Sequence, residues 1–186
     1  MQSVVSRWFG TEFEQLHPLL QALHLRGGVL AGPIEITLGQ GLARPFGLAI
    51  ARKLGIPLRV GPHSLQVEVG HQSDRLLWSR RFDDRQRMDS TFRPVGAWPD
   101  GMWLEQTGPV RLGLAVEVID GGWYWRCRKA WLFGISLPLA LFPRSDAYKC
   151  VEDGRYRFQV TFTMPLLGCV LSYGGLLESQ PAPAVE

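Results

Sequence analysis

The stretch that decides the fold is VRLGLAVEVIDGGWYWRCRKAWL, residues 110–132. Its first half alternates, with apolar side chains at Val110, Leu112, Leu114, Val116 and Val118. A period of two predicts a half-buried strand. Asp120-Gly-Gly122 follows, and these residues favour a tight turn because they adopt positive φ at little cost. Residues 123–132 then return along the first strand, so the segment predicts an antiparallel β-hairpin.

The same pattern continues on both sides of this hairpin. Short apolar runs separated by Gly, Pro, Asp or Ser predict ten strands in all, at residues 34–38, 65–70, 75–82, 86–93, 102–107, 110–118, 123–132, 146–152, 156–164 and 169–177. Because most connections are short, neighbouring strands should be antiparallel and follow one another in a meander. Residues 134–143, which are apolar and contain Pro138, predict a turn or one short helix.

Two helices are predicted near the N-terminus. Residues 11–24 carry apolar side chains at helical spacing, with Thr11 as a plausible N-cap and Pro18 as a possible kink. Residues 41–54 repeat the spacing, with Pro45 in the first turn and a stop at Gly55. The second helix therefore lies between the first and second strands.

These elements predict a mainly β (α+β) fold. About ten strands in 186 residues need closure or folding over, so we expect a meandering antiparallel barrel or a strongly curved sheet with N-terminal helices. The order of elements resembles that of intracellular fatty-acid-binding proteins, in which a helical segment between the first two strands caps the barrel mouth. The main alternative is a helix-grip fold, against which the missing C-terminal helix counts.

The composition fits a single globular domain. Hydrophobic residues make up 46% and charged residues 20% of the chain, close to globular averages. We expect one domain at residues 1–178 and a flexible tail at 179–186, which contains Gln180-Pro-Ala-Pro-Ala184. The net charge of +3 is too small to predict nucleic-acid binding.

The cysteines and the apolar runs bear on localisation. The chain has 3 cysteines, Cys127, Cys150 and Cys169, without a C-x-x-C spacing, which predicts neither a disulfide framework nor a zinc site. Residues 1–10 lack the apolar run of a signal peptide, and no segment is apolar enough for a transmembrane helix. These features predict a soluble cytoplasmic protein.

Catalytic signatures are missing from the sequence. It contains no G-x-G-x-x-G, Walker A, H-E-x-x-H or G-x-S-x-G motif. The four histidines, His17, His24, His63 and His71, are not at metal-ligand spacing and predict ordinary surface or helix-end roles. We therefore expect no catalytic residue, no metal and no cofactor, and a binding protein rather than an enzyme.

Arg80 is the charged residue most worth attention. It lies two residues from Trp78 and two from Phe82, so a regular strand sends all three side chains to one apolar face. A buried guanidinium there could bind a carboxylate or phosphate through its fork of donors. The alternative is an internal ion pair with Asp89 or Glu105. The arginines opposite apolar faces are expected to be solvated, namely Arg126, Arg128, Arg155 and Arg157.

Aromatic residues and the second helix supply the other candidate ligand contacts. Trp103 belongs to a set of tryptophans, with Trp123, Trp125 and Trp131, that could line a pocket or fill the core. If the second helix caps a barrel, Phe46 and Ile50 should face the interior. The candidate ligand-binding residues are therefore Arg80, Trp78, Phe82, Phe46, Ile50 and Trp103.

Five short motifs carry a family resemblance: Trp78-Ser-Arg-Arg-Phe82, Glu105-Gln-Thr-Gly-Pro109, Gly154-Arg-Tyr-Arg-Phe158, Pro165-Leu-Leu-Gly168 and Tyr173-Gly-Gly-Leu176. In this order they resemble a bacterial domain family of unknown function, which occurs alone or at the C-terminus of saccharopine-dehydrogenase-like NAD(P)-binding chains. The resemblance covers residues 11–178. It implies an accessory or ligand-binding domain and assigns no catalytic residue.

Two functions of different class follow. A closed barrel of this strand number can enclose an apolar cavity, which predicts non-catalytic binding of a small apolar or amphiphilic, lipid-like molecule, including an acidic one. The alternative is a protein-interaction module for an NAD(P)-dependent, reductase-like partner. An enzyme acting within the cavity lacks a visible pair of nucleophile and base.

Overall fold

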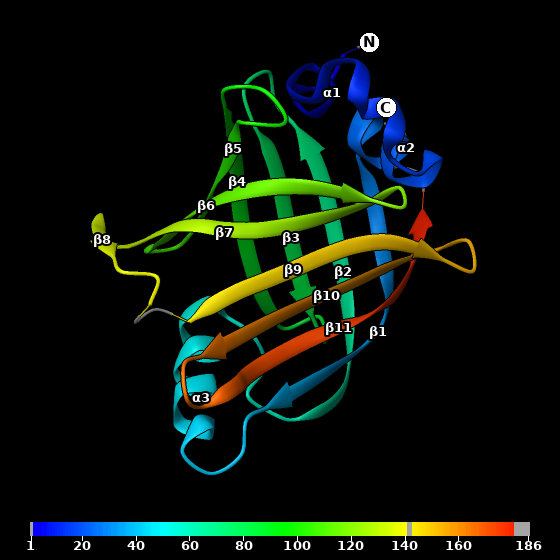
Figure 1. Cartoon of the computed structure of the whole chain (residues 1–186). Helices are drawn as coiled ribbons and strands as arrows, with labels where there is room; N and C mark the ends of the chain where they lie inside the picture. The colour runs from blue at the N-terminus through cyan, green and yellow to red at the C-terminus, as the bar shows by residue number, and fades with distance from the viewer. Residues whose placement is uncertain (1, 141–142, 181–186) are drawn as a thin grey trace.

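The computed structural model describes residues 2–140 and 143–180, and in them eleven strands and four short helical segments (Figure 1). The helical segments are α1 (Val4–Phe9), the 3-10 helix η1 (Gly10–Gln15), α2 (Pro18–Arg26) and α3 (Ala43–Leu54). The strands are β1 (Gly28–Leu38), β2 (Gly61–His71), β3 (Leu76–Phe82), β4 (Gln86–Val95), β5 (Met102–Thr107), β6 (Val110–Ile119), β7 (Gly122–Leu132), β8 (Ile135–Leu137), β9 (Arg144–Glu152), β10 (Arg155–Met164) and β11 (Gly168–Gln180).

Ten of these strands close into an antiparallel barrel. The strands from β1 to β7 pair in sequence order, then β7 pairs with β9, β9 with β10 and β10 with β11. The barrel closes where β1 pairs with β11, through partners such as Ile36 and Tyr173. The short strand β8 pairs with β7 alone among the described strands. The predicted meandering antiparallel barrel, with a helix between its first two strands, is confirmed.

The two ends of the barrel carry different helices (Figure 1). The segments α1, η1 and α2 cover the end where Trp103 and Trp123 lie buried, and Trp8 of α1 packs 5.4 Å from Trp103 between ring centroids. Helix α3 lies at the other end against β11 and β1. A Cβ on Gly47 would lie 2.0 Å from the Val170 carbonyl oxygen, so glycine allows α3 to approach β11 closely.

The N-terminal helices differ from the sequence prediction. Helix α1 begins at Val4, with Ser3 and Ser6 forming a reciprocal capping box, and Thr11 lies inside η1 instead of capping a helix. Pro18 occupies the first turn of α2, where its missing N–H is not needed. The segment is therefore divided before Pro18 instead of kinked at it. Neither α1 nor α2 is long enough for the spacing of its apolar residues alone to predict where the helix begins and ends.

The end of the chain also differs in detail. Strand β11 runs to Gln180 and pairs with Val29 there, so residues 179 and 180 belong to the strand instead of the expected tail. The remainder of that tail, residues 181–186, lies outside the described residues. None of the described helices is long and apolar enough to cross a membrane.

Candidate functional site: a cavity inside the barrel

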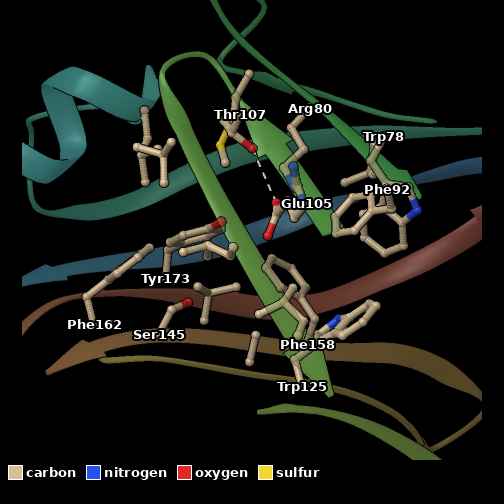
Figure 2. Close-up of a pocket in the computed structure, with 18 of the residues that line it drawn as sticks. Trp78, Arg80, Phe92, Glu105, Thr107, Trp125, Ser145, Phe158, Phe162 and Tyr173 are labelled. Atoms are coloured by element: carbon tan, nitrogen blue, oxygen red, sulfur yellow. Dashed lines mark hydrogen bonds between the residues drawn. The ribbon is translucent and has the colours of Figure 1, made fainter. Parts of the chain in front are cut away.

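The barrel interior contains a cavity of about 170 Å³ (Figure 2). A single water molecule needs roughly 10 to 15 Å³ by a similar measure, so the space is well above that of an isolated packing defect. Most of the wall is apolar or aromatic, including Leu65, Val67, Met88, Phe92, Leu112, Leu114, Trp125, Phe158, Val160 and Phe162. The α3 end is bordered by Ile50, Lys53 and Leu54.

Arg80 lies inside this apolar wall. Arg80 is 8% exposed, and its guanidinium donates a hydrogen bond of 2.9 Å to Ser90 Oγ on β4. The guanidinium also lies 5.3 Å from the Trp78 ring centroid, an arrangement that stabilises a cation. Within the described ranges, no carboxylate oxygen lies within 4.0 Å of Arg80.

A chain of polar side chains leads from Arg80 to Glu105, and Figure 2 shows its last contact, between Thr107 and Glu105. Ser90 Oγ lies 2.6 Å from Thr107 Oγ1, and the Thr107 hydroxyl donates to Glu105 Oε1 at 3.3 Å. Glu105 thus reaches Arg80 through two hydroxyl groups instead of a direct ion pair. One of the two predicted ion-pair partners is therefore linked to Arg80 only indirectly.

The other predicted partner, Asp89, is not available to Arg80. Asp89 is exposed, accepts from Arg87 at 2.9 Å, and pairs across the strands with Ser79. Since successive residues of a strand face opposite sides, Asp89 lies outside the barrel while Ser90 lies inside. The proposed Arg80–Asp89 pair was wrong for this reason.

Buried polar atoms at the cavity lack partners. The Tyr156 hydroxyl and Trp78 Nε1 belong to cavity-lining residues, and the described residues offer neither a hydrogen bond. Burial raises the pKa of Tyr156, and the nearby positive charge of Arg80 opposes that shift. A buried polar atom without a partner is costly, and Tyr156 and Trp78 each carry such an atom on a residue that lines the cavity.

Lys149 is the second basic residue of the interior. It lies on β9, is 2% exposed, and its Nζ is 2.7 Å from Nε2 of the buried His24 on α2. Burial, and then the charge of Arg80, lower the pKa of Lys149 well below its ordinary value. Burial, followed by the charges of Lys149 and His71, likewise lowers the pKa of His24. His24 lies in the last turn of α2, one of the two places predicted for the histidines, but it is buried and therefore not a surface residue.

The structure separates the six sequence-predicted site residues into three cases: three line the cavity, two are buried beside it, and Phe46 is exposed. Trp78, Arg80 and Ile50 line the cavity. Phe82 and Trp103 are fully buried, but they are outside the cavity wall, in contact with other aromatic rings. They contribute to the core that surrounds the cavity.

Phe46 does not face the barrel interior, contrary to the prediction from the sequence. It is 45% exposed and does not line the cavity. The residues of α3 that face the barrel are Ala43, Gly47 and Ala51, which are buried, together with Ile50 and Leu54 at the cavity. Phe46 projects to one side of this stripe, because adjacent helical residues are separated by about 100°. Ala43, Gly47 and Ala51 are small and add little to the apolar pattern of the sequence. The larger Phe46 was therefore assigned to the buried face by mistake.

The sequence interpretation did not select Lys149, His24, Ser90 or Thr107. Along β9 the inward positions are Ser145, Ala147 and Lys149, whereas Tyr148 and Cys150 occupy the alternate positions. The alternate positions also hold Arg144, Asp146 and Glu152, and the inward set contains a serine and a lysine, so polar residues occur on both faces and alternation does not identify Lys149 as buried. In contrast, Arg80 shares its face with large aromatic residues and was identifiable.

The outer arginines do not reach the cavity. Arg126 pairs with Glu117 at 2.8 Å, Arg157 lies 3.8 Å from Glu152, and Arg128 and Arg155 are exposed. Burial raises the pKa of the Cys127 thiol to about 11 and also raises that of Cys150, so neither thiol is activated as a nucleophile. The described residues contain no group of three His, Cys, Asp or Glu side chains that could hold a metal ion.

One comparison with known proteins gives a match. A family model described as "Domain of unknown function (DUF4166)" matches residues 16–177. The match covers α2, α3 and almost the entire barrel, including both Arg80 and Lys149. No curated protein matches the chain.

Proposed function

The chain belongs to this family, DUF4166, whose function is unknown, and we propose that its barrel binds a small amphiphilic molecule with an acidic head group in the interior cavity. The observation that carries the proposal is the buried Arg80 guanidinium, which lines the cavity and has a single hydroxyl as its hydrogen-bond partner among the described residues. The binding is non-catalytic.

The acidic head group follows from the chemistry of Arg80. A guanidinium has five N–H donors, and one of its nitrogens donates to Ser90 Oγ. Placing a charge in a low-dielectric interior costs several kcal/mol unless it is paired. A carboxylate is the ligand group that matches the remaining donors, because it accepts two parallel hydrogen bonds from the guanidinium fork. The Tyr156 hydroxyl supplies a further polar group on the same cavity.

The apolar tail follows from the rest of the wall. Beyond the polar chain from Arg80 to Glu105, most of the lining is aliphatic or aromatic, and such a surface favours an alkyl or ring portion by the hydrophobic effect. The α3 end, bordered by Ile50, Lys53 and Leu54, is the entrance that we assign to the ligand. The other end is filled by Trp103, Trp123 and the residues of α1 and α2.

Titration with octanoate tests this function. Trp78 and Trp125 line the cavity, so ligand entry should change tryptophan fluorescence. Ala147 also lines the cavity, and Ala147→Phe should fill it and abolish the change. Ala115 lies on β6 between the inward Leu114 and Val116, so Ala115→Phe on the outer face is the matched control. Equal octanoate affinity in the two variants would contradict binding in the cavity.

The alternative is an accessory module that docks on an NAD(P)-dependent, reductase-like partner, as the family resemblance implies. Exposed apolar side chains, Leu42, Phe46, Phe133 and Ile135, would provide the contact for it. This function needs no cavity. Capture of such a partner that survives Ala147→Phe and is lost on Phe133→Ser would support it over ligand binding.

A further inference from the structure

Lys149 has an environment that an ordinary ion-pairing lysine does not have. Its Nζ lies 3.8 Å from the Trp123 ring centroid, 4.8 Å from that of Trp78 and 5.5 Å from that of Trp125. Within the described part of the chain, no carboxylate oxygen lies within 4.0 Å of it. Lys149, Trp78 and Trp125 all line the cavity, so the amine lies at its tryptophan-rich end, under α2.

The surroundings of Lys149 favour a neutral amine. The groups that face it are His24 from α2, Arg80 from β3 and the three indole rings, while His71 lies beyond His24. Burial and the charge of Arg80 lower the pKa of Lys149. The indole faces favour the ammonium, by about 2 kcal/mol for a desolvated contact, but removing a charge from water costs several kcal/mol. Desolvation is therefore the larger effect. Desolvation and a neighbouring cation are the two conditions that make a lysine nucleophilic.

His24 gives the amine a proton-transfer partner. Its Nε2 lies 2.7 Å from Lys149 Nζ, and its Nδ1 has no hydrogen-bond partner among the described residues. Because the pKa of His24 is also lowered, by burial first and then by Lys149, the ring is neutral and can accept a proton. The pair thus combines a nucleophile with a base within hydrogen-bond distance.

We propose that Lys149 is a covalent attachment site, at which Nζ condenses with an aldehyde-bearing amphiphile in the cavity to form a Schiff base. This inference rests on the proposed function only in requiring that amphiphiles enter the cavity. It adds a class of ligand, apolar aldehydes, to the acidic class that Arg80 favours.

The reaction balances without an oxidant or a cofactor. Nζ attacks the carbonyl carbon, a C–N bond forms, and the first of the two amine protons passes through His24 to the carbonyl oxygen, which becomes a hydroxyl group. His24 then accepts the second proton from the nitrogen and gives it to the hydroxyl group, whose C–O bond breaks so that it leaves as water. One amine and one aldehyde therefore give one imine and one water. When the imine is protonated, the faces of Trp123 and Trp78 stabilise its charge by the cation–π interaction.

The test uses octanal with cyanoborohydride, which reduces an imine to a stable secondary amine. The chain has three lysines. Lys129 is exposed and does not line the cavity, so it acts as the internal control, whereas Lys53 borders the cavity entrance. An amine in water is almost wholly protonated at pH 7, and each unit of lowered pKa raises the neutral fraction about tenfold. We expect peptide mapping at pH 7 to show at least about tenfold more octyl adduct on Lys149 than on Lys129.

The variants separate this inference from the proposed function. Lys149→Met keeps most of the side-chain stem and should lose the dominant adduct, whereas Lys129→Met, at an exposed position, should keep both the Lys149 adduct and octanoate binding. If Lys149→Met fails to fold, the distribution of adduct over the three lysines of the wild type decides the question. An adduct on Lys149 no greater than on Lys129, with octanoate still bound, would overturn the covalent site and leave the proposed function intact. Failure to bind octanoate together with a dominant Lys149 adduct would overturn acid binding alone.

Discussion

Nζ of Lys149 lies 2.7 Å from Nε2 of His24, a residue 125 positions earlier in the chain, and both side chains are buried. This contact joins the helical cap at one end of the barrel to the β9 wall. Two cations at this distance would repel each other strongly in a low-dielectric interior. The folded protein therefore holds at least one of the two groups neutral, and the stability of the protein should depend on pH through them.

Lys149→Met should stabilise the protein more at neutral pH than near pH 10. The folded-state pKa of Lys149 is lowered, so between that pKa and about 10.4 the unfolded chain binds a proton that the folded chain does not. The free energy of unfolding of the wild type then rises with pH through this window, by at most about 1.4 kcal/mol per pH unit. The advantage of the variant should shrink as the pH approaches 10.

Urea unfolding of both proteins at several pH values measures this difference. Lys129→Met, at an exposed position of β7, is the matched control and should show no such trend. An advantage of Lys149→Met that stays constant across the window would mean that Lys149 carries the same charge when folded and unfolded.

Arg80→Met should weaken octanoate binding and leave the affinity for octanol unchanged. The variant keeps much of the stem's packing and removes the guanidinium fork. Hydrogen bonds to charged groups contribute about 1.5 to 3 kcal/mol, which corresponds to a loss of about 10- to 100-fold in octanoate affinity. Fluorescence titration with both compounds provides the measurement, and the exposed Arg155→Met is the control. Equal losses for octanoate and octanol would show that Arg80 supports the barrel without contacting the head group.

Ile50 and Phe46 should respond differently to alanine. Phe46 is exposed, so Phe46→Ala should change the free energy of unfolding by less than about 1 kcal/mol and leave octanoate affinity unchanged. Ile50 borders the cavity, and Ile50→Ala should widen the entrance and speed both binding and release in stopped-flow fluorescence. If Phe46→Ala alters these rates and Ile50→Ala does not, the ligand enters elsewhere.

Gly47→Ala should destabilise the protein although it raises helix propensity. Alanine in an exposed helix position gains about 1 kcal/mol over glycine, but here the new Cβ would lie 2.0 Å from the Val170 carbonyl oxygen. Overpacking of this kind costs about 1 to 3 kcal/mol, and α3 must shift from β11. Thermal unfolding gives the sign, and a raised melting temperature would show that α3 is not fixed against the barrel.

The barrel was predictable because each strand carries its own local signal. The alternation from Val110 to Val118 and the Asp120-Gly-Gly122 turn define β6 and β7 without reference to the rest of the chain. Closure was not predictable in the same way, because the pairing of β1 with β11 joins the two ends of the barrel sequence. No pattern of residues within β1 or β11 indicates which strand it pairs with.

A site residue could be predicted from the sequence only where large apolar residues two positions away identify the buried face of its strand. Arg80 lies between Trp78 and Phe82, which identify its side of β3. Lys149 lies on β9, where both faces carry polar residues, and its partner His24 comes from a separate helix. A buried amine enclosed by three indole rings and an imidazole from a distant part of the chain leaves no local pattern in the sequence, so sequence reasoning missed it.

The most direct test of acid binding in the barrel is a crystal structure of the protein soaked with octanoate. We expect electron density in the cavity between β3 and β9, with the carboxylate oxygens within hydrogen-bond distance of the Arg80 guanidinium and the alkyl chain against Phe158 and Val160. An empty cavity at saturating octanoate, or octanoate bound with its carboxylate away from Arg80, would contradict the account.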